Sequence, residues 1–184
     1  IEPKSGEILA IASSPSYDPN LLSGKDFSSN YLKLQIDTLK PIYNRALMAT
    51  YPPGSMFKLV QGLIGLEEEL VKYNDQVYVD LNSIGDLAPA GNYDLKKAIV
   101  KSSNNYFFKL FRKIINQNIN NNTFIDSNIG LNKWSKYVKM FGLGSNLNFN
   151  ISSVNSGYVP SSNYYDTYYG KNRWKFSNVY SLSI

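Results

Sequence analysis

Apolar residues recur with the 3.6-residue period of an α-helix in three stretches of the chain. The stretches are Met56, Leu59, Val60, Leu63 and Ile64; Phe107, Leu110, Phe111, Ile114 and Ile115; and Leu131, Trp134, Tyr137, Val138 and Phe141. The first stretch predicts a helix over residues 55–70. The third predicts a helix that Gly142 ends, because glycine is common just past a helix C-terminus. A further helix is predicted over residues 28–39, and a short one before Met48.

Extended structure is predicted at two places. Residues 7–13 place Ile8, Leu9 and Ile11 among polar residues, and Val77 to Val79 are β-formers in a row. The asparagine-rich residues 116–122 predict a surface loop. Residues 145–169 are polar and rich in tyrosine and carry few helix signals; their tyrosines fit loop packing better than a groove for glycan or peptide. The mixture predicts an α/β (α+β) protein.

Composition excludes several classes of protein. The chain has 184 residues, of which 43% are hydrophobic and 18% charged, as in a globular domain with a substantial core. The net charge of +5 would suit an anionic membrane or a cell-wall polymer, but a lysine-rich surface is the commoner cause. Basic residues form no dense cluster and no nucleic-acid motif occurs, so no nucleic-acid partner is expected. No apolar stretch reaches the roughly 18 residues of a membrane span.

The first candidate for chemistry is the pair Ser55 and Lys58. Pro52, Pro53 and Gly54 favour a turn just before Ser55, which then lies at a helix N-terminus, where free N–H groups favour developing negative charge. Lys58 follows one helical turn later on the same face. A serine needs a base to become a nucleophile. The chain has no histidine, which excludes a Ser-His-Asp triad, but a lysine whose pKa is lowered by burial can act as the base. The spacing alone also fits an ordinary exposed pair.

The second candidate is Ser102-x-Asn104. Asp94 offers an N-cap for a short helix through Ala98, and the next helical stretch begins near Phe107. Ser102 and Asn104 therefore lie in a tight connection between two helices. A hydroxyl there can relay a proton, and an amide can hold a substrate amide. Serine and asparagine are also ordinary turn and capping residues, and that alternative stays open.

Together the two motifs resemble the transpeptidase domain of class B penicillin-binding proteins, whose motif set is completed by Lys-Thr-Gly. The chain is most similar to the penicillin-binding protein 2 group, the monofunctional transpeptidases of rod elongation. Other segments that resemble this family, in its order, are residues 1–10, 15–20, 44–55, 141–144, 156–160, 169–174 and 181–184. The resemblance implies the penicillin-binding-protein and serine β-lactamase-like fold. That fold is an antiparallel sheet flanked by helices, with a helical lobe that carries both motifs.

The resemblance also implies a mechanism. Ser55 attacks the carbonyl of the penultimate D-alanine in a peptidoglycan stem peptide, and Lys58 takes its proton. Ser102 passes a proton to the departing D-alanine, while Asn104 holds the substrate amide and orients Lys58. An amine of a second stem peptide then completes the cross-link. β-Lactams mimic the D-alanyl-D-alanine terminus and trap Ser55.

The implied setting is the periplasmic face of the bacterial plasma membrane, with an anchor outside this chain. Implied partners are stem peptides, β-lactams, a glycan polymerase of the SEDS family and the elongation machinery. No cofactor is expected. Some relatives bind zinc near the second motif through Asp, His and Cys, but this chain contains neither His nor Cys.

The sequence also departs from the family pattern in its later motifs. It contains no Lys-Thr-Gly, and it stops where a Gly-Gln-Gly turn would follow. Residues 1–184 are therefore expected to be a partial transpeptidase domain, inactive alone. The N-terminal anchor, the pedestal and the C-terminal strands with Lys-Thr-Gly would be absent, and the first strand would have an unpaired edge.

Two other functions share the same motifs. A penicillin-binding sensor or non-catalytic scaffold remnant would keep Ser55 without cross-linking. A serine β-lactamase would hydrolyse the acyl-enzyme, which requires a base that activates water. No acidic residue of this chain lies in a recognisable deacylation motif.

Overall fold

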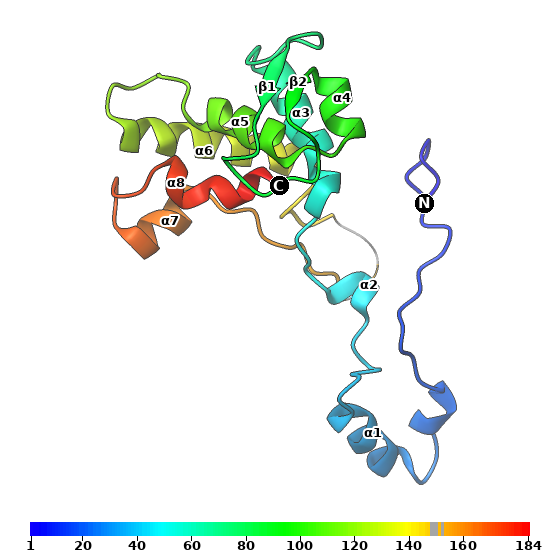
Figure 1. Cartoon of the computed structure of the whole chain (residues 1–184). Helices are drawn as coiled ribbons and strands as arrows, with labels where there is room; N and C mark the ends of the chain where they lie inside the picture. Colours follow the sequence, from blue (N-terminus) through cyan, green and yellow to red (C-terminus); the bar gives the residue numbers. More distant parts are fainter. Residues whose placement is uncertain (148–150, 152) are drawn as a thin grey trace. The chain divides into compact units, whose positions relative to one another are not determined.

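The computed structural model describes residues 1–147, 151 and 153–184 (Figure 1). The chain forms two compact units. Unit 1 comprises Ile1–Tyr51 and Asn146–Ser156, and unit 2 comprises Pro52–Ser145 and Gly157–Ile184. No helix among the described residues is both long enough and apolar enough to cross a membrane.

The described part of unit 1 contains short elements: the 3-10 helix η1 (Pro19–Leu22) and the helices α1 (Phe27–Ile36) and α2 (Arg45–Met48). The helix predicted over residues 28–39 is confirmed as α1, and the short one before Met48 as α2. Ser13 links distant parts of this unit, because its Oγ accepts from Arg45 N (2.9 Å) and lies 3.5 Å from Tyr43 O, to which it donates. The Arg45 guanidinium donates to Leu39 O (2.7 Å), so it stabilises the turn before α2.

The strand predicted over residues 7–13 is wrong for the described structure. These residues form no strand, and Leu9 and Ile11 are exposed. An isolated extended segment needs a neighbouring strand to pair its N–H and C=O groups. The described part of unit 1 supplies no such neighbour, so alternation of apolar residues is not sufficient here.

The elements of unit 2 follow one another in a mixed order. They are η2 (Gly54–Phe57), α3 (Lys58–Glu67), β1 (Val77–Val79), β2 (Gly91–Tyr93), α4 (Leu95–Val100), α5 (Asn104–Ile115), α6 (Thr123–Met140), α7 (Ser162–Tyr169), α8 (Phe176–Val179) and η3 (Tyr180–Ser183). The strands pair antiparallel, with Val77 opposite Tyr93 and Val79 opposite Gly91. This confirms the short strand predicted at Val77–Val79.

Three local predictions in unit 2 hold because the residues that carry them act locally. The Asp94 carboxylate accepts from Lys97 N (2.7 Å) and caps α4. The predicted helix over residues 55–70 forms as η2 followed by α3. Gly142 follows the end of α6 at a φ of +83°, a left-handed conformation that glycine adopts easily.

Helix α5 lies at the centre of the core and packs against α3, α6, β1 and η3. Two glycines permit this packing. A Cβ on Gly65 of α3 would lie 2.7 Å from Leu110 Cδ1, and a Cβ on Gly130 of α6 would lie 2.1 Å from the carbonyl oxygen of Ile115. The second distance leaves no room for any side chain, so Gly130 lets α6 lie directly against the end of α5.

A buried amide connects three helices within this core. Gln61 of α3 is fully buried, its Nε2 donates to Leu182 O of η3 (2.9 Å), and its Oε1 accepts from Trp134 Nε1 of α6 (2.9 Å). Both ends of the amide are therefore satisfied, as a buried polar group requires. In Figure 1 the segment from α7 to η3 runs alongside α5 and α6.

Helix α7 contradicts the prediction that residues 145–169 contain little helix. Tertiary contacts override the weak local signal: Tyr165 is buried against Trp174, with ring centroids 5.2 Å apart, and Asp166 Oδ1 accepts from Trp174 Nε1 (2.7 Å). Tyr165 therefore packs from a helix and not from a loop, while Tyr158 and Tyr168 are exposed. Residues 148–150 and 152 of the same predicted segment lie outside the described residues.

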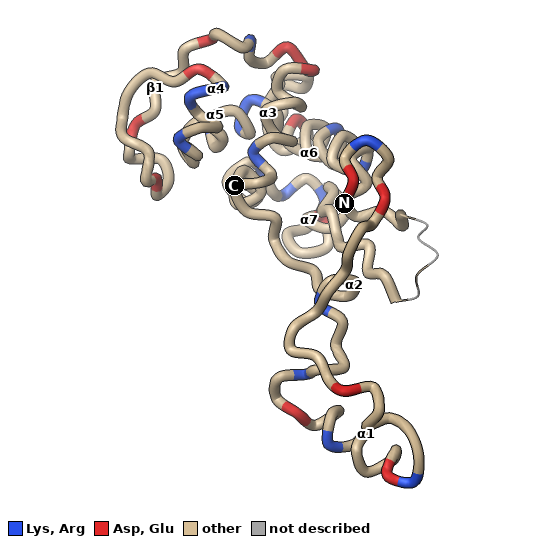
Figure 2. The backbone as a smooth tube through the Cα atoms, turned by 90° about the vertical axis from the view of Figure 1, so that its right-hand side faces the viewer, with Lys and Arg blue, Asp and Glu red and all other residues tan. Residues whose placement is uncertain are grey.

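Charges of both signs are interspersed along the backbone (Figure 2). One group of them is partly buried: Glu68, at the end of α3, pairs with Lys133 of α6 and accepts from the Tyr137 hydroxyl (2.6 Å). Burial alone would raise the pKa of Glu68, but the hydrogen bonds from Lys133 and Tyr137 outweigh it and hold that pKa below its ordinary value. The bond from Tyr137 to Glu68 raises the pKa of Tyr137 to about 12.

Candidate active site

Lys58 is the buried centre of the candidate site. It is the first residue of α3, and only 2% of its surface is exposed. Its Nζ donates to Ser102 O (2.6 Å), Ser102 Oγ (3.0 Å) and Asn104 Oδ1 (2.6 Å). An ammonium group has three donors, so these acceptors satisfy all of them. Residues separated by 44 and 46 positions in sequence thus meet at one atom.

Ser55 lies in η2, one turn before Lys58, and is exposed. Its Oγ accepts a hydrogen bond from Ser102 Oγ at 3.0 Å. The sequence predicted that Lys58 lies directly beside Ser55. In the described structure the hydrogen-bonded link between them is the Ser102 hydroxyl, which contacts both. The four candidate residues therefore form one chain, from Asn104 through Lys58 and Ser102 to Ser55.

The backbone before Lys58 presents Ser55 at a helix start. Gly54 has a φ of +58°, and the 3-10 helix that follows leads without interruption into α3. The first N–H groups of a helix have no acceptor within it, and Gly54 and Ser55 are the first two residues of η2. Such donors suit an oxygen that gains negative charge.

Ser102 adopts a left-handed conformation, with a φ of +50°. It ends α4 in a Schellman motif: Ser102 N donates to Ile99 O (3.0 Å), and Ser103 N donates to Ala98 O (2.9 Å). Glycine is the usual residue at this position, because a Cβ disfavours the left-handed region. The strained turn brings both the carbonyl and the hydroxyl of Ser102 within reach of Lys58 Nζ.

Burial governs the charge of Lys58. Removal from water lowers the pKa of Lys58, and the negative charge of Asp86 partly opposes this effect. The Phe107 ring, whose centroid lies 5.9 Å from Nζ, contributes to the poorly solvated surroundings. A lysine in this state loses its extra proton at lower pH than an exposed lysine, as a base must.

Sequence reasoning did not identify Asp86. This residue lies in the connection between β1 and β2, and its partners in the Ser-x-Asn turn follow 17 and 19 residues later. No local pattern marks it, because an aspartate after a glycine in a polar loop is ordinary turn chemistry. A long-range contact was the only available signal.

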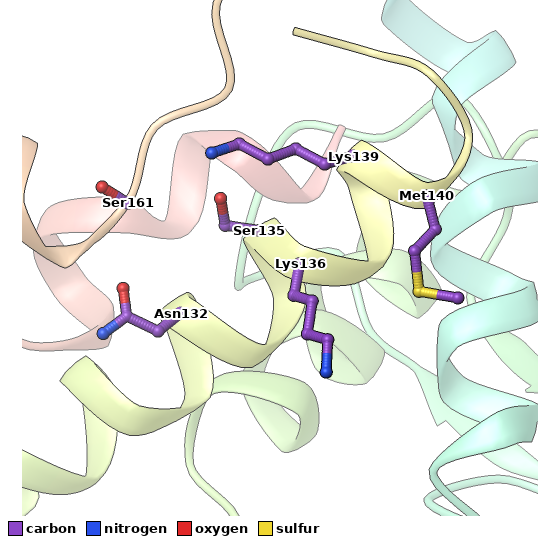
Figure 3. A pocket seen from close by; sticks show the side chains of 6 residues that line it. All are labelled: Asn132, Ser135, Lys136, Lys139, Met140 and Ser161. Carbon is purple, nitrogen blue, oxygen red and sulfur yellow. The ribbon is translucent and has the colours of Figure 1, made fainter. Parts of the chain in front are cut away.

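A separate cavity of about 490 Å³ lies between α6 and the segment before α7 (Figure 3). Its lining residues are Asn132, Ser135, Lys136, Lys139, Met140 and Ser161. None of the four candidate residues is among them. Within the described ranges, no three His, Cys, Asp or Glu side chains lie close enough together to hold a metal ion.

Comparison with known proteins identifies the fold. A solved complex between penicillin-binding protein 2 and MreC from Helicobacter pylori superimposes with a TM-score of 0.76 and 26% identity, over 97% of this chain and 32% of that chain. The imipenem acyl-enzyme complex of penicillin-binding protein A from Mycobacterium tuberculosis gives a TM-score of 0.65 and 30% identity, over 85% of this chain and 36% of that one. The α/β transpeptidase fold expected from the sequence is thereby confirmed.

A curated relative agrees with these structures. The chain is 30% identical to the peptidoglycan D,D-transpeptidase MrdA of Acinetobacter baumannii over 198 aligned residues, which cover 100% of this chain and 26% of the relative. The chain thus spans about a quarter of the length of that protein. The family model described as the penicillin binding protein transpeptidase domain matches residues 1–182. By this match over nearly its whole length, the chain belongs to the transpeptidase domain family of penicillin-binding proteins.

Proposed function

We propose that the protein containing this chain is a peptidoglycan D,D-transpeptidase whose acyl-enzyme forms on Ser55. One observation carries the proposal: a continuous hydrogen-bonded path runs from the buried Lys58 Nζ through Ser102 Oγ to the exposed Ser55 Oγ, in steps of 3.0 Å. The path joins a base of lowered pKa to a nucleophile that substrate can reach. The similarity to the peptidoglycan D,D-transpeptidase of Acinetobacter baumannii supports the reaction class.

The direction of the hydrogen bonds suggests how the proton moves. With Lys58 charged, protons point from Nζ to Ser102 and from Ser102 to Ser55. Once Lys58 loses one proton, both bonds can reverse, so that Ser55 donates to Ser102 and Ser102 donates to Nζ. As Ser55 Oγ bonds to the substrate carbonyl carbon, its proton passes to Ser102 and the Ser102 proton passes to Lys58.

The same path serves the second half of the step. When the tetrahedral intermediate collapses, the bond to the departing D-alanine breaks, and Ser102 gives its proton to that amine while Lys58 replaces it. An amine of a second stem peptide then attacks the acyl-enzyme, and its proton passes through Ser102 to Lys58. As this intermediate collapses, the bond to Ser55 Oγ breaks, and the same path returns a proton to Ser55, which restores the resting state. Asn104 orients Lys58 and offers its amide to the substrate peptide.

Partners and location follow from the same assignment. Stem peptides are the substrates, and β-lactams acylate Ser55 in their place, as imipenem does in the mycobacterial relative. The MreC complex of the Helicobacter protein supports a place in the elongation machinery, with a SEDS-family glycan polymerase as the partner that supplies uncross-linked strands. The active domain faces the periplasm and is held at the plasma membrane by a segment other than residues 1–184.

The cleft also needs a third motif. Residues 1–184 contain Ser-x-x-Lys and Ser-x-Asn but no Lys-Thr-Gly. We infer that these residues are a partial transpeptidase domain, and that Lys-Thr-Gly comes from the rest of the protein. Activity is therefore expected from the full-length protein and not from residues 1–184 alone.

Acylation by penicillin tests the proposal. Full-length protein incubated with a fluorescent penicillin should gain one drug per molecule by intact mass, and Ser55→Ala should gain none. Ser29→Ala is a matched control, because this exposed serine bonds only to its own helix through Asp26 O (3.0 Å). Undiminished labelling of Ser55→Ala would refute the nucleophile. Rapid turnover of nitrocefin would favour a β-lactamase, and stable acylation without cross-linking of stem peptides would favour a sensor.

A further inference from the structure

Asp86 holds the turn that carries the second motif. Its Oδ2 accepts from Ser103 Oγ (2.8 Å) and from Asn105 N (2.8 Å), and its Oδ1 accepts from Ala88 N (3.0 Å). Ser103 is the N-cap of α5, and its Oγ also accepts from Tyr106 N (3.2 Å). One carboxylate thus joins the β1–β2 connection to the cap of α5. Its partners Ser103 and Asn105 each directly follow a candidate catalytic residue of the second motif.

Two neighbouring backbone carbonyls of the same loop also accept hydrogen bonds from this turn. Gly85 O accepts from Asn104 Nδ2 (2.8 Å), and Ile84 O accepts from Asn105 Nδ2 (2.8 Å). A carbonyl can only accept, so the NH₂ group of Asn104 must face Gly85. The Asn104 Oδ1 is thereby turned toward Lys58 Nζ, 2.6 Å away. The loop therefore decides which end of the Asn104 amide meets the lysine.

We propose that Asp86 is a positioning residue for acyl transfer: it fixes the turn from which Ser102 and Asn104 reach Lys58, and its negative charge acts on the Lys58 ammonium. This inference rests on the proposed function of the site. Asp86 itself does not touch the reacting atoms. It acts through Ser103 and through the loop that orients Asn104.

Asp86 is ionised at neutral pH, because its pKa is lowered. Partial burial would raise the pKa of Asp86, but hydrogen bonds from the backbone of Asn105 and Ala88 and from Ser103 outweigh this effect and lower it. Among the described residues, Asp86 is the charged group that acts on Lys58. The other groups against Nζ are neutral: the Ser102 hydroxyl and carbonyl, the Asn104 amide and the Phe107 ring.

Asp86→Asn in the full-length protein tests both effects. The partners of the Asp86 carboxylate are all donors, so the NH₂ group of an asparagine would face a donor and leave it without an acceptor. The turn would then be held less firmly, and the plateau rate of penicillin acylation should fall by roughly tenfold or more. Loss of the negative charge should also lower the pKa of Lys58 further. The acidic limb of the acylation rate against pH should therefore move to lower pH, which a merely structural defect would not cause.

Asp80→Asn is the matched control. Asp80 lies in the same connection and is paired with Lys109 Nζ at 2.6 Å, away from the Ser-x-Asn turn. The Asp80→Asn variant removes an equal charge, and it should leave the acylation rate and the acidic limb of its pH profile unchanged. If Asp86→Asn keeps the wild-type acylation rate and acidic limb, the inference about Asp86 is overturned. If the unmodified protein is not acylated at Ser55, the proposed function is overturned instead.

A second variant covers the case in which Asp86→Asn does not fold. Ser103→Ala removes one donor to Asp86 and leaves the carboxylate charged. It should acylate several-fold more slowly, with the acidic limb at its wild-type pH. A wild-type rate in this variant, with the melting temperature measured alongside, would overturn the positioning role.

Discussion

Lys58 Nζ lies 2.6 Å from Asn104 Oδ1, and each residue is the first of its helix. The contact therefore joins the starts of α3 and α5, the two helices whose packing forms much of the core. Small displacements of one helix along the other would separate the Lys58 ammonium from the Asn104 amide. The chemistry of the site thus depends on the glycines and the buried amide that set this packing.

Replacement of Lys58, the proposed base, should slow acylation strongly. In Lys58→Arg the guanidinium stays charged and cannot accept a proton, so the penicillin acylation rate should fall at least about a hundredfold. In the unmodified protein the rate should rise with pH through the pKa of Lys58, because only the neutral amine is a base and burial lowers that pKa. Stopped-flow acylation from pH 5 to 10 measures both. Lys101→Arg, an exposed lysine just before the Ser-x-Asn motif, should change neither.

Two substitutions of Ser102 separate backbone strain from chemistry. Ser102→Gly and Ser102→Ala both remove the hydroxyl that links Lys58 to Ser55, so both should slow acylation about a hundredfold or more. They differ in stability. The left-handed backbone, with its φ of +50°, suits glycine, so Ser102→Gly should be about 1 kcal/mol more stable than Ser102→Ala. Urea denaturation compares them, and equal stabilities would contradict the strain.

The contact between α5 and α6 should not tolerate a methyl group. Gly130→Ala places a Cβ 2.1 Å from the Ile115 carbonyl oxygen, a backbone atom that cannot rotate away. We expect a loss of about 2–4 kcal/mol in unfolding free energy, or no folded protein. Gly62→Ala is the control in the interior of α3: the nearest atom to its Cβ belongs to the flexible Leu95 side chain, at 3.2 Å, and Phe107 Cε1 lies in ordinary contact at 3.9 Å. Higher helix propensity should keep that variant within about 1 kcal/mol of wild type.

The Glu68 cluster should make stability depend on acid pH. The pKa of Glu68 is lowered in the folded protein, so its contribution is present above the unfolded value near 4.5 and is lost as the pH falls through the folded value. Glu68→Gln should therefore cost about 1–3 kcal/mol at pH 7, and the difference from wild type should shrink below pH 4.5. Glu67→Gln, at the exposed neighbouring position, should cost less than about 0.5 kcal/mol. A pH-independent difference at Glu68 would refute the role of its charge.

Predictions from sequence succeeded where the causes are local. The apolar period of α3, the Asp94 cap and the Gly142 terminus each act within a few residues, so the pattern contains the answer. Helix α7 was missed because contacts with Trp174 stabilise it from outside the helix. The strand over residues 7–13 was wrong because pairing requires a partner that no local pattern guarantees.

The residues of the candidate site also fall into those that sequence motifs identify and those that only three-dimensional contacts identify. Family motifs led to Ser55, Lys58, Ser102 and Asn104, and the structure brings these four side chains together. Their roles in catalysis remain predictions. The Ser102 link between Ser55 and Lys58 depends on a three-dimensional turn, which residue spacing does not encode. Asp86 could not be predicted either, because its partners in the Ser-x-Asn turn lie 17 and 19 residues away.

The Gln61 amide couples the fluorescence of Trp134 to the position of η3. The Trp134 indole N–H is held by Gln61 Oε1, and the other end of the same amide is held by Leu182 O. Departure of η3 would free that amide, and the emission wavelength and intensity of Trp134 would respond. Intrinsic fluorescence can therefore follow, without an added dye, how firmly the last residues of the chain are seated against the helix that begins with Lys58.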